Sequence, residues 1–297
     1  MSRAHPIISV TGASGSGRGT VREAFRNVFH RQGIRAVFVD GESFHRYDRE
    51  EMAKARRAAE TAAGGCATFS HFGPEANLFE DLETLFRTYG ETGTGRHRAY
   101  LHSDEDALPH AAQGLRPGQF TPWADIRPGT DVLVYEGLHG AVKTDTVDVS
   151  RHVDLRIGVA PIINLEWIQK LHNDTTLRGY SEQAVMDVIL RRMHDYVHYV
   201  IPQFERSDIN FQKVSVVDTS DPIVARDVPS DDECLVVIRF RDPDAHSIDF
   251  PYLLRELHDS RMTRRNTIVV PGGKLGLAME LILAPITDRL CAARKAA

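Results

Sequence analysis

A glycine-rich stretch near the amino terminus carries the residues with the clearest chemical meaning. The apolar run Ile7–Thr11 leads directly into residues 12–20, which read GASGSGRGT. A buried strand that turns through glycines into a helix aims backbone N–H groups at a phosphate, and Gly12 and Gly17 have the spacing of such a loop. The sequence therefore predicts a nucleotide phosphate site formed by Gly12, Ala13, Ser14, Gly15, Ser16, Gly17, Arg18, Gly19 and Thr20.

Two positions of this loop depart from the usual pattern. Arg18 stands where a lysine is common, and Gly19 replaces the serine or threonine whose hydroxyl ligates Mg²⁺. Thr20 offers a hydroxyl one position later, although the geometry of a helix points that position in another direction. Thr20 is still one candidate metal ligand. The missing hydroxyl at position 19 leaves open how this loop would bind Mg²⁺.

A carboxylate follows the apolar segment 131–135, at Glu136. An acid at the end of a strand beside the phosphate-loop strand is where nucleotide kinases hold Mg²⁺, directly or through water. Taken alone, Glu136 is a solvated strand terminus. Together with the glycine-rich loop, it becomes a candidate magnesium residue.

Residues 40–49, DGESFHRYDR, follow the second apolar strand, where ligands of open α/β sheets bind. An acid in this segment can accept a proton from an attacking hydroxyl, and its basic residues can hold an anionic acceptor. The alternative is an exposed loop with balanced charges. The neighbouring phosphate loop favours the chemical interpretation.

A further charged segment spans residues 167–180. Lys170 and Asp174 are four residues apart, so they share one face of a helix. They predict either a surface ion pair worth a few tenths of a kcal/mol or a lid that brings lysine and arginine over a transferring phosphoryl group. The pair Arg191 and Arg192 is open between solvated surface and an anionic effector site.

Bulk composition narrows the class of protein. The chain has 297 residues, a net charge of −5 and a pI of about 6.3, which gives no electrostatic drive toward nucleic acid or a membrane. Its three cysteines are far apart without metal-ligand spacing, which favours a reducing compartment. The first strand begins at residue 7, leaving no room for a signal peptide, and no apolar run spans a membrane. We therefore expect a cytoplasmic protein.

Strand-like and helix-like segments alternate along the chain, which predicts a mostly parallel sheet covered by helices on both faces. We expect one domain over residues 1–297, because no repeat or linker interrupts the pattern. A Gly/Pro-rich excursion with a strand-like piece at 98–101 lies between residues 90 and 128. The expected strands are 7–11, 36–40, 131–135, 154–161, 214–217, 235–240 and 267–270, and the expected helices are 20–32, 50–63, 77–89, 164–176, 181–197 and 275–294.

The combination of these segments resembles bacterial phosphoribulokinase, and the similarity runs along essentially the whole chain. The segments that carry it are PIISVTG at 6–12, FHR at 44–46, TFSHF at 68–72, YEGLHG at 135–140, NLEWIQK at 164–170, RRMH at 191–194, INFQ at 209–212, DFPY at 249–252 and IVVPG at 268–272.

The resemblance implies a fold, an activity and partners. The fold is an α/β, three-layer P-loop kinase fold with a mostly parallel central sheet, similar to nucleotide monophosphate kinases. The implied reaction is phosphorylation of the 1-hydroxyl of ribulose 5-phosphate by ATP and Mg²⁺ in the Calvin cycle. The family also implies a homo-oligomer that NADH activates and AMP inhibits.

The resemblance also implies roles for individual residues. Glu42 takes the place of the catalytic acid, Lys170 contacts the transferring phosphoryl group, and Asp174 shapes the lid. Glu136 stands at the metal-associated acid position. The sugar phosphate is expected near His45, Arg49, Tyr100, His102 and Arg178, and the activating nucleotide near Arg31, Arg239 and Arg264.

Three departures from the family cluster around the chemistry: Glu42 replaces an aspartate, Asn173 an arginine, and Gly19 a serine or threonine. The extra methylene of Glu42 displaces its carboxylate by about 1.5 Å, and misplacement of that order costs ~10²-fold in rate. The sequence therefore allows a phosphoribulokinase with retuned catalysis, a kinase for a different phosphorylated sugar or nucleoside, or an impaired paralogue that binds nucleotide and phosphosugar as a regulatory subunit.

Overall fold

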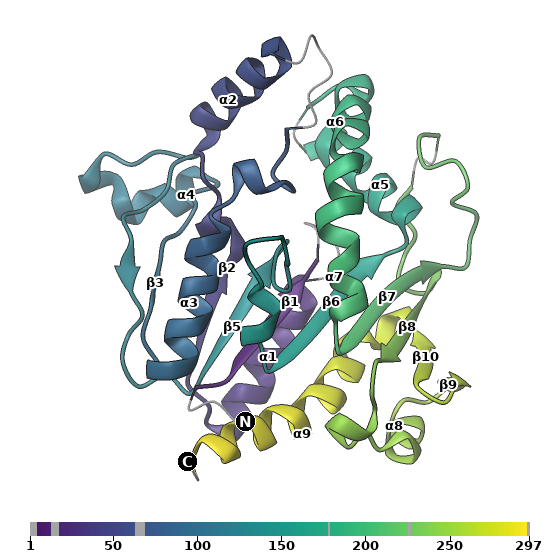
Figure 1. Ribbon diagram of the computed structural model, residues 1–297. Helices are drawn as coiled ribbons and strands as arrows, with labels where there is room; N and C mark the ends of the chain where they lie inside the picture. Colours follow the sequence, from purple (N-terminus) through teal and green to yellow (C-terminus); the bar gives the residue numbers. More distant parts are fainter. Residues whose placement is uncertain (1–4, 13–17, 63–68, 178, 225–226, 296–297) are drawn as a thin grey trace.

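An eight-stranded sheet organises the chain, with strand order β2-β5-β1-β6-β7-β8-β10-β9 (Figure 1). The computed structural model describes residues 5–12, 18–62, 69–177, 179–224 and 227–295. The strands of the sheet are β1 (Ile7–Thr11), β2 (Ala36–Asp40), β5 (Val132–Gly137), β6 (Leu155–Pro161), β7 (Ile209–Ser215), β8 (Cys234–Phe240), β9 (Arg261–Arg264) and β10 (Thr267–Pro271).

The sheet has a parallel half and an antiparallel half. Strands β2, β5, β1, β6 and β7 pair in parallel, so their carboxyl ends share one edge. Strands β8, β10 and β9 continue the sheet through antiparallel pairings. The expected α/β fold with a mostly parallel sheet is confirmed in the half that contains the phosphate-loop strand.

Helices cover both faces of the sheet, as expected for parallel strands that are buried throughout. The helices are α1 (Arg18–Gln32), α2 (Arg49–Ala62), α3 (Phe79–Thr92), α4 (Asp104–Ala107), α5 (Ile163–His172), α6 (Glu182–Asp195), α7 (Ile201–Arg206), α8 (Phe250–Glu256) and α9 (Leu275–Lys295).

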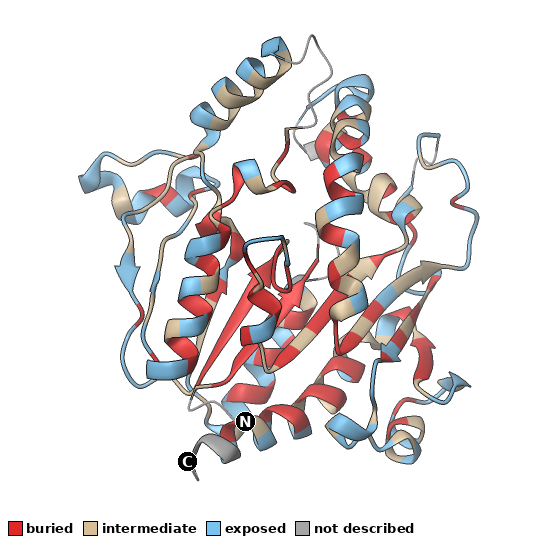
Figure 2. Cartoon of the chain, in the orientation of Figure 1, coloured by how far each residue is buried: buried red, intermediate tan, exposed pale blue. Residues whose placement is uncertain are grey.

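Alternating side chains of β1 divide the core into two layers. Ile8 and Val10 pack with α1 and α9 on one face, whereas Ile7 packs with α3 on the other. All three are fully buried. Figure 2 shows the central strands in the colour of buried residues, and α3 with one buried and one exposed side. This is the two-residue period of a strand between two helical layers.

Several expected segments differ from the structure. The strand expected at 98–101 is wrong, because the excursion pairs β3 (Arg96–His97) with β4 (Ala124–Asp125), and Tyr100 makes only an isolated bridge to Phe120. The strand expected at 214–217 begins earlier, at Ile209. Ile209 and Phe211 alternate into the core, whereas Val216 is 59% exposed. The sequence prediction missed α7, α8 and β9 altogether.

Helices α5 and α6 both end in π-helical turns. The helix expected at 164–176 ends at His172 and continues as the π-turn Asn173–Leu177. The helix expected at 181–197 ends at Asp195 and continues as the π-turn Tyr196–Val200. Single π-turns inside helices occur frequently at functional sites.

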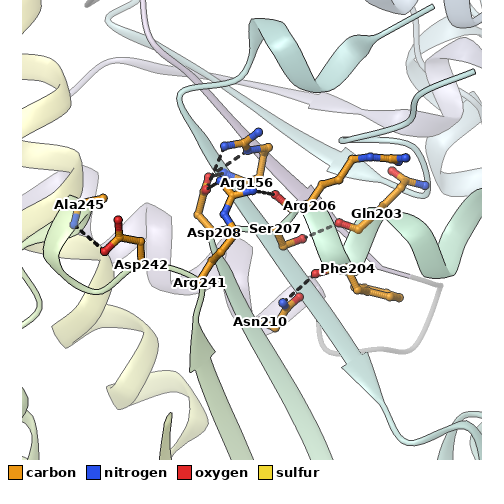
Figure 3. Close-up of polar contacts among 10 residues, drawn as sticks. All are labelled: Arg156, Gln203, Phe204, Arg206, Ser207, Asp208, Asn210, Arg241, Asp242 and Ala245. Atoms are coloured by element: carbon orange, nitrogen blue, oxygen red, sulfur yellow. Dashed lines mark hydrogen bonds and ion pairs between the residues drawn. The ribbon is translucent and has the colours of Figure 1, made fainter. Parts of the chain in front are cut away.

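Asp208, just before β7, joins three strands at the amino end of the parallel half (Figure 3). Its Oδ2 accepts from the backbone N and Nε of Arg156 on β6, at 2.9 and 3.0 Å. Its Oδ1 accepts from Arg156 Nη2 at 2.9 Å and from Arg241, which follows β8. Asp208 is 5% exposed, and its carboxylate accepts four hydrogen bonds. These bonds compensate the burial of its charge and hold the strand ends together.

Candidate active site

Gly12, at the start of the predicted phosphate loop, lies at the carboxyl edge of the parallel strands (Figure 1). Gly12 follows β1, and its N–H donates to the carbonyl of Gly137 at the end of β5, at 3.0 Å. Helix α1 begins at Arg18, so the expected order of strand, loop and helix holds at both ends of the loop. Ala13, Ser14, Gly15, Ser16 and Gly17 lie outside the described residues.

Glu136 stands at this edge and is 3% exposed. The Nε of Arg22, on α1, donates to its Oε2, and the Nη2 of Arg22 lies 3.7 Å from Asp40 Oδ2. Asp40 and Glu136 are register partners on β2 and β5. Arg22 therefore holds two strand-end carboxylates together at the place where the sequence expects a metal-associated acid. Sequence reasoning missed Arg22, whose only signal is its position one helical turn after Arg18.

The donors at this edge fit Mg²⁺, which binds one or two carboxylates and keeps phosphate and water as its other ligands. Glu136 and the half-exposed Asp40 provide carboxylate oxygens. Among the described residues, no cluster of three or more His, Cys, Asp or Glu forms a separate metal site. A Cβ at Gly19 would have no heavy atom within 4 Å, and Thr20 Cγ2 lies 3.7 Å from the Cβ position of Gly276 on α9.

Glu42 lies in the short 3₁₀ turn Gly41–Phe44 that follows β2. Asp40 caps this turn by accepting from the backbone N of Glu42 at 3.2 Å. Gly41 presses against the end of β5: a Cβ on it would lie 2.7 Å from the Cα of Gly137, so only glycine allows this approach. The turn carrying the candidate base is thus packed directly against the strand end that carries Glu136.

The carboxylate of Glu42 contacts a histidine from the excursion. Glu42 Oε2 lies 2.6 Å from His102 Nε2. This hydrogen bond raises the pKa of His102 above its ordinary value. The Nη2 of Arg49 donates to the carbonyl of His102 at 3.2 Å, and the Tyr100 ring stands edge-on to His102 with centroids 4.9 Å apart. The structure therefore brings Glu42, Arg49, Tyr100 and His102 together from two segments distant in sequence.

Three histidines beside this group are neutral at pH 7. His45 Nδ1 lies 3.2 Å from His71 Nδ1, and His139 Nε2 lies 3.3 Å from the carbonyl of His71. Burial lowers the pKa of His45 to about 3, of His71 to about 4 and of His139 to about 3. His45 can therefore offer hydrogen bonds but no positive charge. His71 and His139 were missed as members of this cluster, because only the fold brings them to His45.

The expected pairing of Lys170 with Asp174 is confirmed. Lys170 Nζ lies 2.5 Å from Asp174 Oδ2, and Asp174 is 7% exposed. One turn earlier on α5, Glu166 accepts from the hydroxyl of Tyr196 at 3.2 Å, and burial raises the pKa of this carboxyl. Arg178, the expected phosphate ligand, lies outside the described residues.

Helices α2 and α6 flank the carboxyl edge from opposite sides (Figure 1), and an ion pair joins them. Arg191 Nη1 on α6 lies 3.2 Å from Glu60 Oε1 on α2. The guanidinium of Arg192 lies 5.5 Å from the centroid of the Phe72 ring. Arg191 therefore joins α6 to α2 by an ion pair, which was neither of the two alternatives that the sequence offered for it.

The three candidate effector arginines lie on different parts of the sheet. Arg239 and Arg264 are both register partners of Thr267, on the antiparallel half. Arg239 alternates with core residues of β8 and is exposed. Arg31 lies at the end of α1, on the face where that core packs, and its Nη2 lies 2.7 Å from Glu280 Oε2. It lines a cavity of about 520 Å³ between α8 and α9.

Among the described residues, no helix combines the length and the hydropathy that crossing a membrane requires.

Comparison with known proteins gives matches along the whole chain. The model of the phosphoribulokinase/uridine kinase family matches residues 7–220. A chromosomal phosphoribulokinase of Cupriavidus necator is 55% identical over all 297 residues and 99% of its own length. Phosphoribulokinase 1 of Cereibacter sphaeroides is also 55% identical, over the full length of both chains. The solved structure of phosphoribulokinase from Rhodobacter spheroides has a TM-score of 0.88 at 52% identity and covers 98% of this chain and 99% of that one.

Proposed function

The chain belongs to the phosphoribulokinase/uridine kinase family, and we propose that it transfers the γ-phosphoryl group of ATP to the 1-hydroxyl of ribulose 5-phosphate. The product is ribulose 1,5-bisphosphate, which carbon fixation consumes. One observation carries the proposal in the structure. The cluster of Glu42, Arg49, Tyr100 and His102 stands beside the predicted phosphate loop, where an acceptor would meet the γ-phosphate.

The residues divide the reaction between them. The oxygen of the 1-hydroxyl forms a bond to the γ-phosphorus, while the bond from that phosphorus to the ADP oxygen breaks. Glu42 accepts the proton that the hydroxyl loses. Lys170, held by Asp174, offers a positive charge to the transferring group.

Glu136 and Asp40 are the residues that we assign to Mg²⁺, which would neutralise charge on the β- and γ-phosphates. Thr20 is not assigned to it, because its methyl group lies toward Gly276 on α9.

Permanent positive charge in the acceptor site comes from arginine rather than from the buried His45. His45 is neutral, so it can orient a sugar hydroxyl or a phosphate oxygen only by a hydrogen bond. Arg49 provides the permanent charge in the described part of the site, and we assign the same role to Arg178. A planar guanidinium matches the geometry of a phosphate monoester.

The hydrogen bond between Glu42 and His102 supports a working site. A carboxylate displaced by one methylene would lose its alignment if nothing held it, whereas here it has a partner at 2.6 Å. Although Glu42 replaces an aspartate, His102 therefore holds its carboxylate in one position.

Coupled measurement of ADP release tests the proposal. With MgATP, turnover should depend on ribulose 5-phosphate, and ribose 5-phosphate and uridine should give none. Lys170→Ala should abolish this turnover while the circular dichroism spectrum stays unchanged. Turnover with uridine alone would make the chain a nucleoside kinase. Silence with every acceptor, with ATP still bound by calorimetry, would make it a binding relative without catalysis.

We also propose that effector control requires a second copy of the chain. A nucleotide that contacts Arg31, Arg239 and Arg264 must bridge two protomers, because Arg31 lies on the opposite face of the sheet from Arg239. NADH as activator and AMP as inhibitor remain the family's expected effectors. The cytoplasm, which supplies ATP, is the compartment that we assign to this reaction.

A further inference from the structure

The excursion between α3 and β5 adds no strand to the main sheet. It forms the small ladder of β3 and β4 and supplies Tyr100 and His102 to the acceptor site. Its position relative to Glu42 therefore depends on contacts other than the central hydrogen-bond ladder. Several of those contacts are made by Arg98.

Arg98 donates to two backbone carbonyls of the segment that carries the candidate base. Its Nε lies 2.9 Å from the carbonyl oxygen of Ser43, and its Nη2 lies 2.6 Å from that of His45. In return, the hydroxyl of Ser43 donates to the carbonyl of Arg98. The two carbonyls belong to the residue directly after Glu42 and to the expected sugar ligand His45. Three hydrogen bonds thus join Arg98 to the residues that follow Glu42, two of them through backbone carbonyls and one through the hydroxyl of Ser43.

The guanidinium is also held on its faces. It lies 3.8 Å from the ring centroid of Phe120 and 4.8 Å from that of Trp123. Trp123 packs in turn against Phe44, the last residue of the turn, with centroids 5.7 Å apart. A planar guanidinium can bond two acceptors at its edge while stacking on aromatic rings, whereas a lysine ammonium cannot do both.

We infer that Arg98 is a positioning residue for the acceptor half of the site. Arg98 fixes the backbone of the turn Gly41–Phe44, and His102, four residues later on the same segment, contacts the Glu42 side chain. One segment therefore sets both the backbone and the carboxylate of the candidate base. This inference rests on the proposed function for its kinetic consequence, but the Glu42–His102 contact can be measured without turnover.

The test compares Arg98→Lys with the matched control Arg96→Lys. Arg96 lies two residues earlier, is exposed, and its Nε lies 3.6 Å from Asp125 Oδ1 on the neighbouring strand β4. Because misplacement by about 1 Å costs ~10²-fold in rate, Arg98→Lys should lower kcat/KM for ribulose 5-phosphate by roughly 100-fold and leave KM for ATP within about twofold. Arg96→Lys should match the wild type in both constants.

A second readout separates this inference from the proposed function. In histidine NMR titrations, Arg98→Lys should move the raised pKa of His102 down toward its ordinary value, because the carboxylate of Glu42 shifts away. Glu42→Gln removes the negative charge of that carboxylate and shows how much of the raised pKa of His102 it accounts for. Failure of the proposed function would remove turnover from every variant but leave this shift intact.

Two results would overturn the inference. One is an Arg98→Lys enzyme with wild-type kcat/KM for the acceptor and an unmoved His102 titration. The other is an equal loss for ATP and acceptor, which would indicate general loosening of the fold. If Arg98→Lys does not fold, Phe120→Leu removes one stacking face and keeps both hydrogen bonds, and it should raise KM for the acceptor selectively.

Discussion

Two buried carboxylates in this molecule both contact arginine but lie at opposite ends of the parallel strands. Glu136 and Asp208 are 3% and 5% exposed, and each contacts arginine. Glu136 ends β5 at the carboxyl edge, beside Arg22 and the start of the phosphate loop. Asp208 precedes β7 at the opposite end of the parallel strands, between Arg156 and Arg241 (Figure 3).

The difference shows that the position of a carboxylate in the sheet, rather than its residue type, decides whether it can take part in the reaction or only stabilises the fold. Open α/β sheets bind ligands outside the carboxyl ends of their strands. Asp208 lies away from that edge, and its four hydrogen bonds hold strand ends. Glu136 lies on that edge and shares Arg22 with Asp40, an arrangement that a bound cation or phosphate can alter.

The largest expected effect separates the two carboxylates by activity. Glu136→Gln keeps the shape of the side chain and removes its charge, so kcat should fall by about 10³-fold, comparable to the loss of one electrostatic contact in a transition state. The free energy of unfolding, measured by urea denaturation, should fall less than in Asp208→Asn, because Arg22 keeps Asp40 as a carboxylate partner. Equal kcat in variant and wild type would remove Glu136 from the chemistry.

Asp208→Asn should give the reverse pattern. Removing one member of a buried ion cluster leaves the Arg156 guanidinium poorly compensated, which should cost about 3 kcal/mol in the free energy of unfolding. At a temperature where the variant is folded, kcat should stay within about twofold of the wild type, because the cluster lies at the other end of the strands from the reaction. A large loss of kcat with normal stability would contradict the comparison.

A smaller effect is expected at Gly19, on the catalytic side. Because a Cβ there meets no atom within 4 Å, Gly19→Ser can add the missing hydroxyl without a clash. One extra oxygen ligand should lower the Mg²⁺ concentration for half-maximal turnover by about tenfold, or roughly 1.4 kcal/mol. Gly19→Ala provides the control, since it adds the Cβ without the hydroxyl. Equal Mg²⁺ dependence in both variants would show that this position does not face the metal.

The remaining expected effect concerns stability in acid, near the acceptor site. Burial lowers the pKa of His139 to about 3 in the native protein, whereas in the unfolded chain it stays at about 6.5. As the pH falls below about 6.5, His139 is therefore protonated in the unfolded chain and not in the native protein. The native state should lose roughly 1.4 kcal/mol per pH unit from this histidine between pH 6 and 4. His139→Gln should reduce the slope of unfolding free energy against pH by that amount. An unchanged slope would mean that His139 is charged in the native protein.

Local patterns predicted the parts of the site that depend on neighbouring residues. The order of strand, loop and helix follows from the apolar run Ile7–Thr11 and the glycines after it, and the Lys170–Asp174 pair follows from helical spacing. Glu136 was found because it ends an apolar strand. Each of these inferences needs only a short stretch of chain.

Contacts between distant segments could not be predicted in the same way. The contact between Arg22 and Glu136 spans 114 residues, and the hydrogen bonds from Arg98 to Ser43 and His45 span 55 and 53. The strand expected at 214–217 failed for a related reason. Its valines have a high strand propensity, but the core face of β7 selects Ile209 and Phe211 instead.

Phosphorus NMR of a reaction with MgATP and ribulose 5-phosphate tests the central claim most directly, because it identifies both the acceptor atom and the fate of the phosphoryl group. We predict a new phosphate monoester signal coupled to the protons of carbon 1, in equal amount to the ADP formed. Release of inorganic phosphate without that signal, or a new ester at another carbon, would contradict the assignment of this chain as a kinase of the 1-hydroxyl.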